Sequence, residues 1–277
     1  MLMGAAENVR VAVCGAAGMM GKEVIRAISE ADGVELVAAI DLAAEGIDSG
    51  SAAGIGSNGI VITSDLKQAL LDTQAEVVVD FTLPASLMSN LRIALSCGVS
   101  PVVGTTGLST SDLAELEELA SKASRAVFIA PNFAIGAVLM MEFAERAAAY
   151  LPDVEIIELH HDRKIDSPSG TALLTAQRIG KSRVSAGISP KPVPANLIEK
   201  SPGARGARDA NTGDVPIHSI RLQGFVAHQE VIFGGAGQTL TIRHDSLDRR
   251  SFMPGVVHAA RTVGTLSGVV VGLEKIL

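Results

Sequence analysis

The chain has 277 residues, of which 47% are hydrophobic and 19% charged, so it can bury one large or two modest cores. A formal net charge of −7 and only 3% aromatic residues argue against a nucleic-acid-binding protein. No apolar run has the length of a membrane span, and the short polar N-terminus does not resemble a signal or transit peptide. Two cysteines, Cys14 and Cys97, supply neither a disulfide framework nor a metal site, so we expect a cytoplasmic protein that binds neither membrane nor metal.

The first ordered segment is predicted to be a βαβ unit. Val9–Cys14 is a short run of mostly β-branched residues that indicates a buried strand. A glycine-punctuated turn and a helix ending near Ala31 follow it, and Val34–Ile40 is the next strand. A unit of about thirty residues with a glycine turn after its first strand is the layout of a dinucleotide-binding domain.

The glycine turn and one acid give this unit its predicted chemistry. Gly15, Gly18 and Gly21 let the backbone approach a pyrophosphate, and Asp41, at the end of the second strand, can accept hydrogen bonds from a ribose. The glycine spacing is GxxGxxG and not the more common GxGxxG. A glycine-rich turn in some other α/β domain is therefore the alternative.

The chain up to residue 130 alternates strands with helices, which predicts a Rossmann-type, doubly wound parallel sheet. Strands are expected at 75–80, 100–103 and 127–130, helices at 64–71 (capped by Ser64), 84–97 and 109–124, and a loop at 42–59. Ligands bind beyond the carboxyl ends of such strands. Four strands are followed there by polar or glycine-rich segments, at 15–21, 80–84, 104–107 and 130–133, although each could be a plain loop.

The rest of the chain predicts a second, α+β domain. We expect a helix at 133–150, a strand at 153–159, a helix up to Gly180 and Lys181, a long loop at 182–213, strands at 215–222, 226–233 and 238–245, and a helix at 251–266. The last three strands suggest a meander in a mostly antiparallel sheet. The expected domains are residues 1–134, rejoined by 246–277 through the last helix, and residues 135–245.

The stretch from Glu158 to Ala172, ELHHDRKIDSPSGTA, contains several candidate catalytic and anion-binding residues between a strand and a helix. It holds two adjacent histidines and a lysine. Ser167 before Pro168 reads as an N-cap followed by proline at the first helical position. The amides of the next three residues would then lie at the positive end of the helix dipole and form an anion site. A small carboxylate that is protonated during the reaction fits this loop, but solvated histidines beside an ordinary helix start are the alternative.

Three further histidines, His218, His228 and His244, lie on predicted strands. A metal site would require them to converge, and nothing in the sequence fixes their register. We expect them to be residues of a sheet surface or an interface.

Several motifs together resemble one family, the 4-hydroxy-tetrahydrodipicolinate reductases (formerly dihydrodipicolinate reductases) of lysine and diaminopimelate biosynthesis. The matching segments, in chain order over nearly its whole length, are VAVCGAAGMMG, VVVDFTLP, VVGTTGLS, APNFAIGAVLM, ELHHDRKIDSPSGTA and GDVPIHSIRLQGFVAHQEVIFGGAGQTLTIRHDS. The HHxxKxDxPSGTA pattern within them is highly specific.

The resemblance implies an NAD(P)H-dependent oxidoreductase that reduces a cyclic, imine-type dicarboxylate. It implies a Rossmann domain, a substrate domain and a homotetramer assembled through the substrate-domain sheets. His160 would be the general acid and base, Lys164 a proton donor, and His161 a substrate ligand beside Ser169, Gly170 and Thr171, which would hold a substrate carboxylate. The implied cofactor residues are Gly15, Ala16, Ala17, Gly18, Met19, Met20, Asp41, Gly104, Thr105, Thr106, Ala130, Pro131, Asn132 and Phe133.

The sequence departs from the family at two positions that bear on the cofactor. Members that favour NADPH commonly carry arginine in the glycine turn and just after the acid, where this chain has Met19 and Leu42. A 2′-phosphate would then meet Asp41 without a cation from either position, so we expect a preference for NADH over NADPH. Lys22, or a cation near the 42–59 loop, could still compensate.

Two alternative functions fit the sequence less well. A semialdehyde dehydrogenase would need a nucleophilic cysteine, yet Cys14 ends a buried strand and Cys97 precedes a helix-ending glycine. A non-enzymatic protein that senses NAD(P) would have no reason to keep His160 and Lys164 together.

Overall fold

A computed structural model of the chain describes residues 8–151, 153–188, 211–212 and 215–277. The chain forms two compact units. Unit 1 contains Met1–Ile135 and Arg249–Leu277, and unit 2 contains Gly136–Asp248.

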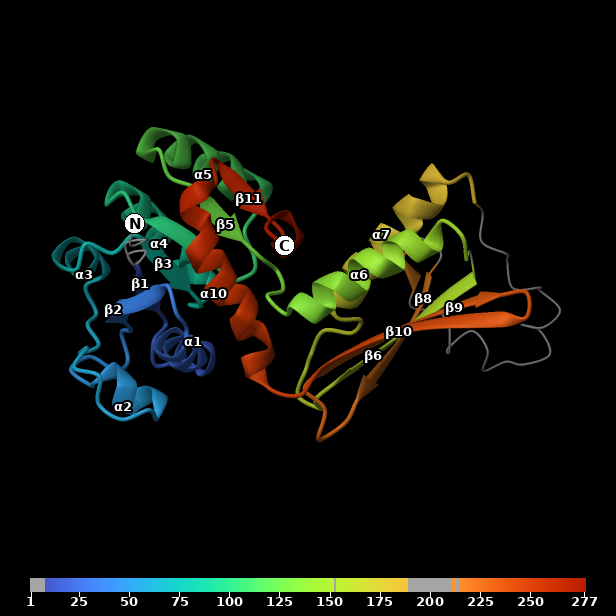
Figure 1. Cartoon of the computed structure of the whole chain (residues 1–277), viewed down its shortest axis with the longest axis horizontal. Coiled ribbons are helices and arrows are strands. Elements are labelled where there is room, and N and C mark those ends of the chain that lie inside the picture. Colours follow the sequence, from blue (N-terminus) through green and yellow to red (C-terminus); the bar gives the residue numbers. More distant parts are fainter. Residues whose placement is uncertain (1–7, 152, 189–210, 213–214) are drawn as a thin grey trace, which may run out of the picture. The chain divides into compact units, whose positions relative to one another are not determined.

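Unit 1 is built on a six-stranded sheet whose order is β11-β5-β4-β3-β1-β2 (Figure 1). Every neighbouring pair in this sheet is parallel. The strands are β1 (Val9–Cys14), β2 (Val34–Ile40), β3 (Val77–Asp80), β4 (Ser100–Val103), β5 (Val127–Ile129) and β11 (Val269–Val271). The central runs are apolar and buried on both faces, as expected for parallel strands covered by helices. The predicted doubly wound parallel sheet is confirmed.

Helices cover both faces of this sheet. The helices of unit 1 are α1 (Met19–Glu30), α2 (Ser49–Ala53), α3 (Leu66–Asp72), α4 (Pro84–Ser96), α5 (Thr110–Ala123) and α10 (Met253–Thr262). Helices α1 and α10 pack against each other on one face, while α3, α4 and α5 follow one another on the opposite face (Figure 1). The late helix α10 therefore packs back on the first part of the chain, as its amphipathic sequence indicated.

Three details of unit 1 differ from the sequence prediction. Helix α3 is capped by Asp65, whose carboxylate accepts from the amide of Gln68, and not by Ser64. The segment 42–59, predicted as a loop, contains the short helix α2. Strand β11 was not predicted, because three apolar residues bounded by glycines carry no readable period.

Unit 2 contains a mixed sheet in the order β10-β9-β6-β8-β7. Its strands are β6 (Asp153–His160), β7 (Asn211–Thr212), β8 (Val215–Arg221), β9 (Ala227–Gly235) and β10 (Gln238–Ser246). Strand β6 lies between β8 and β9, parallel to the first and antiparallel to the second. The mostly antiparallel sheet is confirmed, but the meander is wrong, because β6 separates β8 from β9.

Two helices, α6 (Ile135–Ala148) and α7 (Gly170–Ser185), cover one face of this sheet. Gln229 of β9 donates to Thr175 of α7, with 2.8 Å between Nε2 and Oγ1, and a Cβ on Gly136 of α6 would meet the His244 ring. Gln229 and His244 are direct partners in the β9–β10 ladder, so both helices lie on the same face. Ile156, Val231 and Phe233 fill the core beneath them.

The start and end of α7 differ from the prediction. Its N-cap is Ser169, whose hydroxyl accepts from the amide of Ala172 at 3.2 Å, and the Ser167–Pro168 peptide before it is cis. The predicted N-cap at Ser167 is therefore wrong by two residues. Gly180 and Lys181 lie inside the helix, which continues to Ser185 because Ile179 and Arg183 keep a buried face.

The chain turns away after α7 at Gly187, whose φ is +68°. Most of the long loop predicted at 182–213 lies outside the described residues, which exclude 189–210 and 213–214. Among the helices of the described residues, none is long and apolar enough to cross a membrane.

Candidate functional site

The segments predicted to bind a cofactor follow the carboxyl ends of strands in unit 1. Because β1 to β5 are all parallel, the segments after them meet at one edge of the sheet. Strand β1 continues to β2 on one side of the sheet, and β3 to β5 lie on its other side. The space between β1 and β3 is thus a topological switch point, where open α/β sheets bind their ligands.

The glycines of the first turn are required by close backbone contacts. Gly15 has φ +77°, and a Cβ there would lie 3.0 Å from the carbonyl oxygen of Phe81, across the switch point. A Cβ on Gly21 would lie 2.0 Å from the carbonyl oxygen of Gly15, so the turn folds tightly over the start of α1. Gly18 is the N-cap of α1 and has no side chain to bond the first amides. The turn therefore presents bare backbone at a helix N-terminus, as a pyrophosphate site requires.

Asp41 holds this turn from the end of β2. Its Oδ2 accepts from the amide of Ala17 at 2.9 Å, and its Oδ1 accepts from the amide of Ala43 at 2.9 Å. A carboxylate has about four acceptor positions, so lone pairs remain for a further donor such as a ribose hydroxyl. Met19 and Leu42, the two positions that lack an arginine, are 68% and 82% exposed.

A buried acid organises the next strand ends. Asp80 ends β3 with 1% exposure and accepts from the hydroxyl of Thr82 at 2.7 Å and from Asn90 Nδ2 at 2.9 Å. The hydroxyl of Thr105 donates to the Thr82 carbonyl oxygen at 2.9 Å, and a Cβ on Gly104 would overlap the Phe81 ring. The segment after β4, which contains predicted cofactor residues, is thereby fixed against the segment after β3.

The segment after β5 is anchored by an aromatic side chain. Phe133 is buried against Phe128 and Phe81, with ring centroids 6.1 and 5.9 Å away. Asn132 accepts at Oδ1 from the amide of Ala134 at 2.9 Å. The predicted cofactor residues after β5 thus lie beside the Phe81 segment that also contacts the glycine turn.

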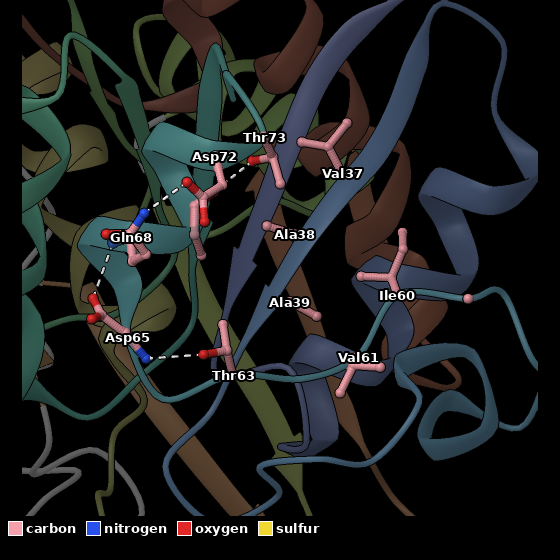
Figure 2. A pocket seen from close by; sticks show the side chains of 12 residues that line it. Val37, Ala38, Ala39, Ile60, Val61, Thr63, Asp65, Gln68, Asp72 and Thr73 are labelled. Carbon is pink, nitrogen blue, oxygen red and sulfur yellow. Dashed lines mark hydrogen bonds between the residues drawn. The ribbon is translucent and has the colours of Figure 1, made fainter.

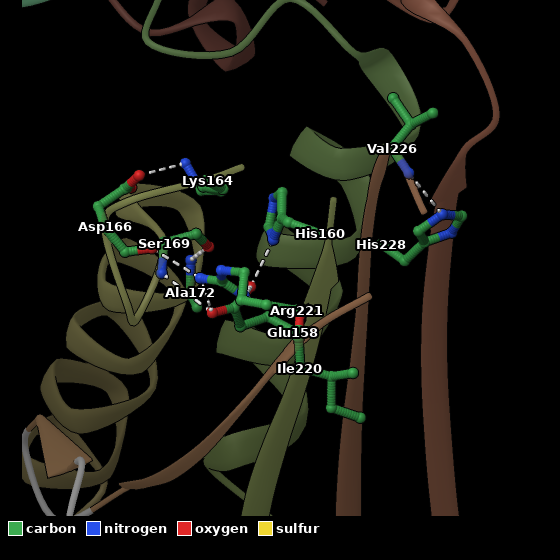
Figure 3. Close-up of polar contacts among 10 residues, drawn as sticks. All are labelled: Glu158, His160, Lys164, Asp166, Ser169, Ala172, Ile220, Arg221, Val226 and His228. Atoms are coloured by element: carbon green, nitrogen blue, oxygen red, sulfur yellow. Dashed lines mark hydrogen bonds and ion pairs between the residues drawn. The ribbon is translucent and has the colours of Figure 1, made fainter. Parts of the chain in front are cut away.

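The histidine-rich stretch lies at the end of β6 in unit 2, where His160 is the last strand residue. Its Nδ1 is hydrogen-bonded to Oε2 of Glu158, whose side chain is fully buried (Figure 3). Arg221, the last residue of the parallel neighbour β8, binds the same carboxylate with two nitrogens, at 2.9 Å from Nη1 to Oε2 and 2.8 Å from Nη2 to Oε1. The imidazole therefore rests on a buried, bidentate ion pair.

The loop after His160 carries the predicted lysine. Lys164 Nζ lies 2.7 Å from Asp166 Oδ1 (Figure 3), and Arg221 Nη2 donates to the Asp166 carbonyl oxygen at 2.7 Å. The amide of Ser169 donates to Glu158 Oε1 at 3.3 Å, so it is not free for a ligand as the sequence suggested. The structure thus joins His160 and the start of α7 to the Glu158 carboxylate, and Arg221 links that carboxylate to Asp166, the partner of Lys164.

The positive charges of this cluster lower the pKa of two carboxyl groups, those of Glu158 and Asp166. Burial alone would raise the pKa of Glu158, but the hydrogen bonds from His160 and Arg221 outweigh it and lower the pKa to about 2. The hydrogen bond and charge of Lys164 lower the pKa of Asp166. Both groups are ionised at neutral pH. His161, the second predicted histidine, keeps its Nδ1 buried, with no hydrogen-bond partner in the described part of the chain.

Glu158 and Arg221 were not among the predicted site residues. A signal for Glu158 was present: it is in phase with Val154 and Ile156, so the alternation of the strand places a carboxylate on the buried face. A buried acid needs a cation or donors, and the sequence could not identify Arg221 because the β6–β8 pairing joins residues 63 positions apart.

Two of the three other strand histidines pair with carboxylates. His218 Nε2 lies 2.8 Å from Glu155, and His228 Nδ1 lies 2.6 Å from Asp245. Burial lowers the pKa of His244, which packs beside α6. Within the described residues, no group of three or more His, Cys, Asp or Glu side chains could hold a metal ion.

A groove of about 390 Å³ runs beside the edge strand β2 (Figure 2). Its polar groups are engaged locally: Gln68 donates from its amide to Asp65 and from Nε2 to Asp72, at 3.0 and 2.7 Å. The residues that line it are Val37, Ala38, Ala39, Gly59, Ile60, Val61, Thr63, Asp65, Gln68, Ala69, Asp72 and Thr73. This set shares no member with the predicted cofactor residues, so the groove is separate from the candidate site.

Each of the two units matches a family model over nearly its whole length. Residues 9–133 match the family model described as dihydrodipicolinate reductase, N-terminus, and residues 136–277 match the model of its C-terminus. The chain is 48% identical over 272 residues to the 4-hydroxy-tetrahydrodipicolinate reductase of Desulfitobacterium hafniense, covering 98% of this chain and 99% of the relative. It is 48% identical over 270 residues to the enzyme of the same name from Moorella thermoacetica, covering 98% of both.

A solved structure agrees with these relatives. The chain is similar to a dipicolinate-bound dihydrodipicolinate reductase from Paenisporosarcina sp. TG-14, with 42% identity, a TM-score of 0.84 and coverage of 98% of this chain and 100% of that one. An amine dehydrogenase from Mycobacterium smegmatis, at 16% identity and a TM-score of 0.65, shares the fold alone.

Proposed function

The chain belongs to the dihydrodipicolinate reductase family, and from that premise we propose how its own residues reduce 4-hydroxy-tetrahydrodipicolinate to tetrahydrodipicolinate, a step of lysine biosynthesis. The substrate carries a hydroxyl group that the product lacks. The reaction therefore consumes one hydride and one proton and releases the hydroxyl group as water. We assign the hydride to NADH or NADPH bound by unit 1, and the proton to a side chain of unit 2.

Unit 1 suits a reduced nicotinamide nucleotide. The amides of Met19 and Met20, at the N-terminus of α1 after Gly18, are proposed to bind the pyrophosphate, and Asp41 has acceptor positions for the adenosine ribose. A side chain on Gly21 would enter the turn itself, and one on Gly15 would meet the Phe81 backbone. When bound, the nucleotide supplies the hydride. The segments after β4 and β5, at 104–106 and 130–133, are proposed to line the rest of its site.

The preferred nucleotide is proposed to be NADH. A 2′-phosphate on the adenosine ribose would lie beside the carboxylate of Asp41, and the exposed side chains of Met19 and Leu42 bring no positive charge to it. Lys22, in the first turn of α1, is the nearest cation in sequence. A clear preference for NADPH in kcat/KM would show that Lys22 or another cation neutralises the phosphate instead, since the 42–59 segment contains no Lys, Arg or His.

Unit 2 is proposed to bind the substrate through its two carboxylates. The Paenisporosarcina relative is described as bound to dipicolinate, a planar dicarboxylate. Here Lys164 supplies a cation, and Ser169, Gly170 and Thr171 form the first turn of α7 at the positive end of its dipole. His161, beside the catalytic histidine, completes the proposed contacts. Because Lys164 already pairs with Asp166, a substrate carboxylate would have to share that cation.

Proton transfer is proposed to occur at His160. Glu158 is ionised and can only accept, so Nδ1 of His160 must donate to it, and Nε2 is the ring atom left to give a proton to the substrate. Hydride addition leaves electron density on the substrate that this proton neutralises. Lys164 is the second proposed proton donor.

The joining of His160 and the α7 N-terminus to Glu158, with Arg221 connecting that carboxylate to the loop of Lys164, carries the proposal. The test is NADH oxidation with substrate generated in place by the preceding synthase, for the wild type and for His160→Gln and Lys164→Ala. Both variants should lose kcat by about 100-fold or more while NADH affinity, measured by fluorescence, is unchanged. Near-wild-type kcat in both would refute the assigned roles.

The assembly and location of the chain are proposals as well. The face of the unit 2 sheet opposite α6 and α7 carries apolar side chains such as Ile220, which is 40% exposed. A sheet face of this kind suits the homotetramer that the family resemblance implies, and sedimentation velocity would measure it. We also propose a cytoplasmic location, since lysine biosynthesis uses the reduced nucleotides of that compartment.

A further inference from the structure

The carboxylate of Glu158 and the guanidinium of Arg221 are placed to act on the reaction without touching the substrate. Glu158 has no exposed side-chain surface, while Arg221 is 17% and His160 13% exposed. Figure 3 shows Glu158 and Arg221 beneath His160, whose second ring nitrogen points away from them. Burying a carboxylate is costly unless it is fully paired, so this arrangement needs a purpose beyond stability.

We propose that Glu158 and Arg221 are a positioning pair that fixes the tautomer and charge of His160 and ties the proton donor to the carboxylate-binding start of α7. The inference rests on the proposed role of His160 as the proton donor.

Glu158 fixes the ring. Because its carboxylate only accepts, Nδ1 of His160 keeps its hydrogen in both charge states, and the exchangeable proton is confined to Nε2. A second hydrogen bond, from the amide of Ser169 to the other carboxylate oxygen at 3.3 Å, joins the N-cap of α7 to the same group. One side chain thus positions both the acid and the element proposed to hold a substrate carboxylate.

Arg221 sets the charge that the ring experiences. Alone, a buried carboxylate beside His160 would strongly favour imidazolium, and the proton would then be held too tightly to be transferred. The two bonds from Arg221 compensate the negative charge. Its Nη2 also donates to the Asp166 carbonyl oxygen at 2.7 Å, which anchors the loop that carries Lys164.

The groups that face His160 define the sign of the expected pH effects. Glu158 on β6 bonds the ring, Arg221 is the register partner of His160 on β8, and the uncharged Ala227 is its partner on β9; Lys164 and Asp166 follow on the loop before α7 and pair with each other. Removing the carboxylate leaves an excess of positive charge, which disfavours imidazolium. Removing the guanidinium leaves an excess of negative charge, which favours it. If imidazolium donates the proton, the alkaline limb of the kcat/KM profile reports the pH at which His160 loses that proton.

Two substitutions should therefore move the pH profile in opposite directions. In Glu158→Gln the alkaline limb should move to lower pH by about one unit, and kcat should fall about 100-fold, since the ring tautomer is no longer fixed. In Arg221→Met the limb should move to higher pH by about one unit, and KM should rise because the Asp166 loop loses its anchor. Arg221→Lys, which keeps the charge, should restore the position of the limb.

A double-mutant comparison separates positioning from general support of the fold. Added to His160→Gln, Glu158→Gln should cost less than about threefold, because the group through which it acts is already absent. The matched control is Glu115→Gln, which breaks an exposed bidentate pair with Arg92, at 2.6 and 2.9 Å, and should leave the profile unchanged. Thermal unfolding of each variant verifies that it is folded.

The outcomes distinguish this inference from the proposed function. If His160→Gln loses activity but a folded Glu158→Gln retains wild-type kcat and pH profile, the positioning pair is refuted. The same holds if the two losses are fully additive. If His160→Gln itself retains activity, the proposed role of His160 fails first. Should Arg221→Met not fold, Glu158→Gln and the double variant still decide the question.

Discussion

The buried Glu158 carboxylate should make unit 2 measurably sensitive to acid. The pKa of this group is lowered from its usual value of 4.5 to about 2 by His160 and Arg221, against the effect of burial. At about 1.4 kcal/mol per pH unit, the difference corresponds to roughly 3 kcal/mol of folding free energy. Because the folded pKa is the lower one, this stability is present above pH 4.5 and is lost as the pH falls toward 2.

The perturbation that tests this value is Glu158→Gln, and the assay is urea-induced unfolding followed by circular dichroism at several pH values. Between pH 5 and pH 3 the wild type should lose about 2 kcal/mol from this group alone, a loss that the variant cannot show. The difference between the two slopes isolates Glu158 from the other carboxylates. Equal slopes for the two proteins would refute the reasoning, since Glu158 would then titrate alike in the folded and unfolded chains.

Three further predictions concern the cofactor and substrate elements. Gly21→Ala places a Cβ 2.0 Å from the Gly15 carbonyl oxygen, so the turn must open; we expect a destabilisation of about 1–3 kcal/mol and at least tenfold weaker NADH binding by fluorescence titration. Introducing arginine at the exposed positions Met19 and Leu42 should raise kcat/KM for NADPH relative to NADH by about tenfold or more. Ser169→Ala removes the N-cap of α7; it should cost about 1 kcal/mol in urea unfolding and weaken the binding of dipicolinate, the ligand bound to the Paenisporosarcina relative, as measured by calorimetric titration.

These predictions have matched controls and clear contradictions. Gly264→Ala adds a Cβ to open space, so it should leave both stability and NADH affinity unchanged. Unaltered NADH affinity in Gly21→Ala would contradict a pyrophosphate site at this turn. An unchanged ratio of the two kcat/KM values in the arginine variant would show that the 2′-phosphate binds elsewhere. If Ser169→Ala and the wild type bind dipicolinate equally well, the start of α7 does not belong to the substrate site.

Unit 1 was largely predictable because its information is local. Buried runs such as Val77–Asp80 and the three glycines of the first turn read directly as strands and a tight turn. Gly98 and Ser109 marked helix ends that the structure reproduces. Where two residues that can cap a helix were adjacent, as at Ser64 and Asp65, the sequence did not decide between them. In the structure the cap is Asp65, whose carboxylate accepts from the amide of Gln68.

Unit 2 was less predictable because its sheet is assembled from distant segments. The position of β6 between β8 and β9 depends on pairing with segments more than 50 residues away, which a short alternating run does not reveal. The same long-range pairing brings Arg221 to Glu158. His160 and Lys164 could be proposed as site residues from their motif, but the ion pair that contacts His160 could not, because its two halves come from different parts of the chain.

The central claim is that this chain reduces 4-hydroxy-tetrahydrodipicolinate with a proton supplied at His160. Its most direct test is single-turnover NADH oxidation with synthase-generated substrate, comparing the wild type with His160→Gln at equal nucleotide saturation. We predict rapid oxidation by the wild type and a rate about 100-fold lower in the variant, with NADH binding unchanged. Equal rates in the two proteins, or no oxidation by the wild type, would contradict this account.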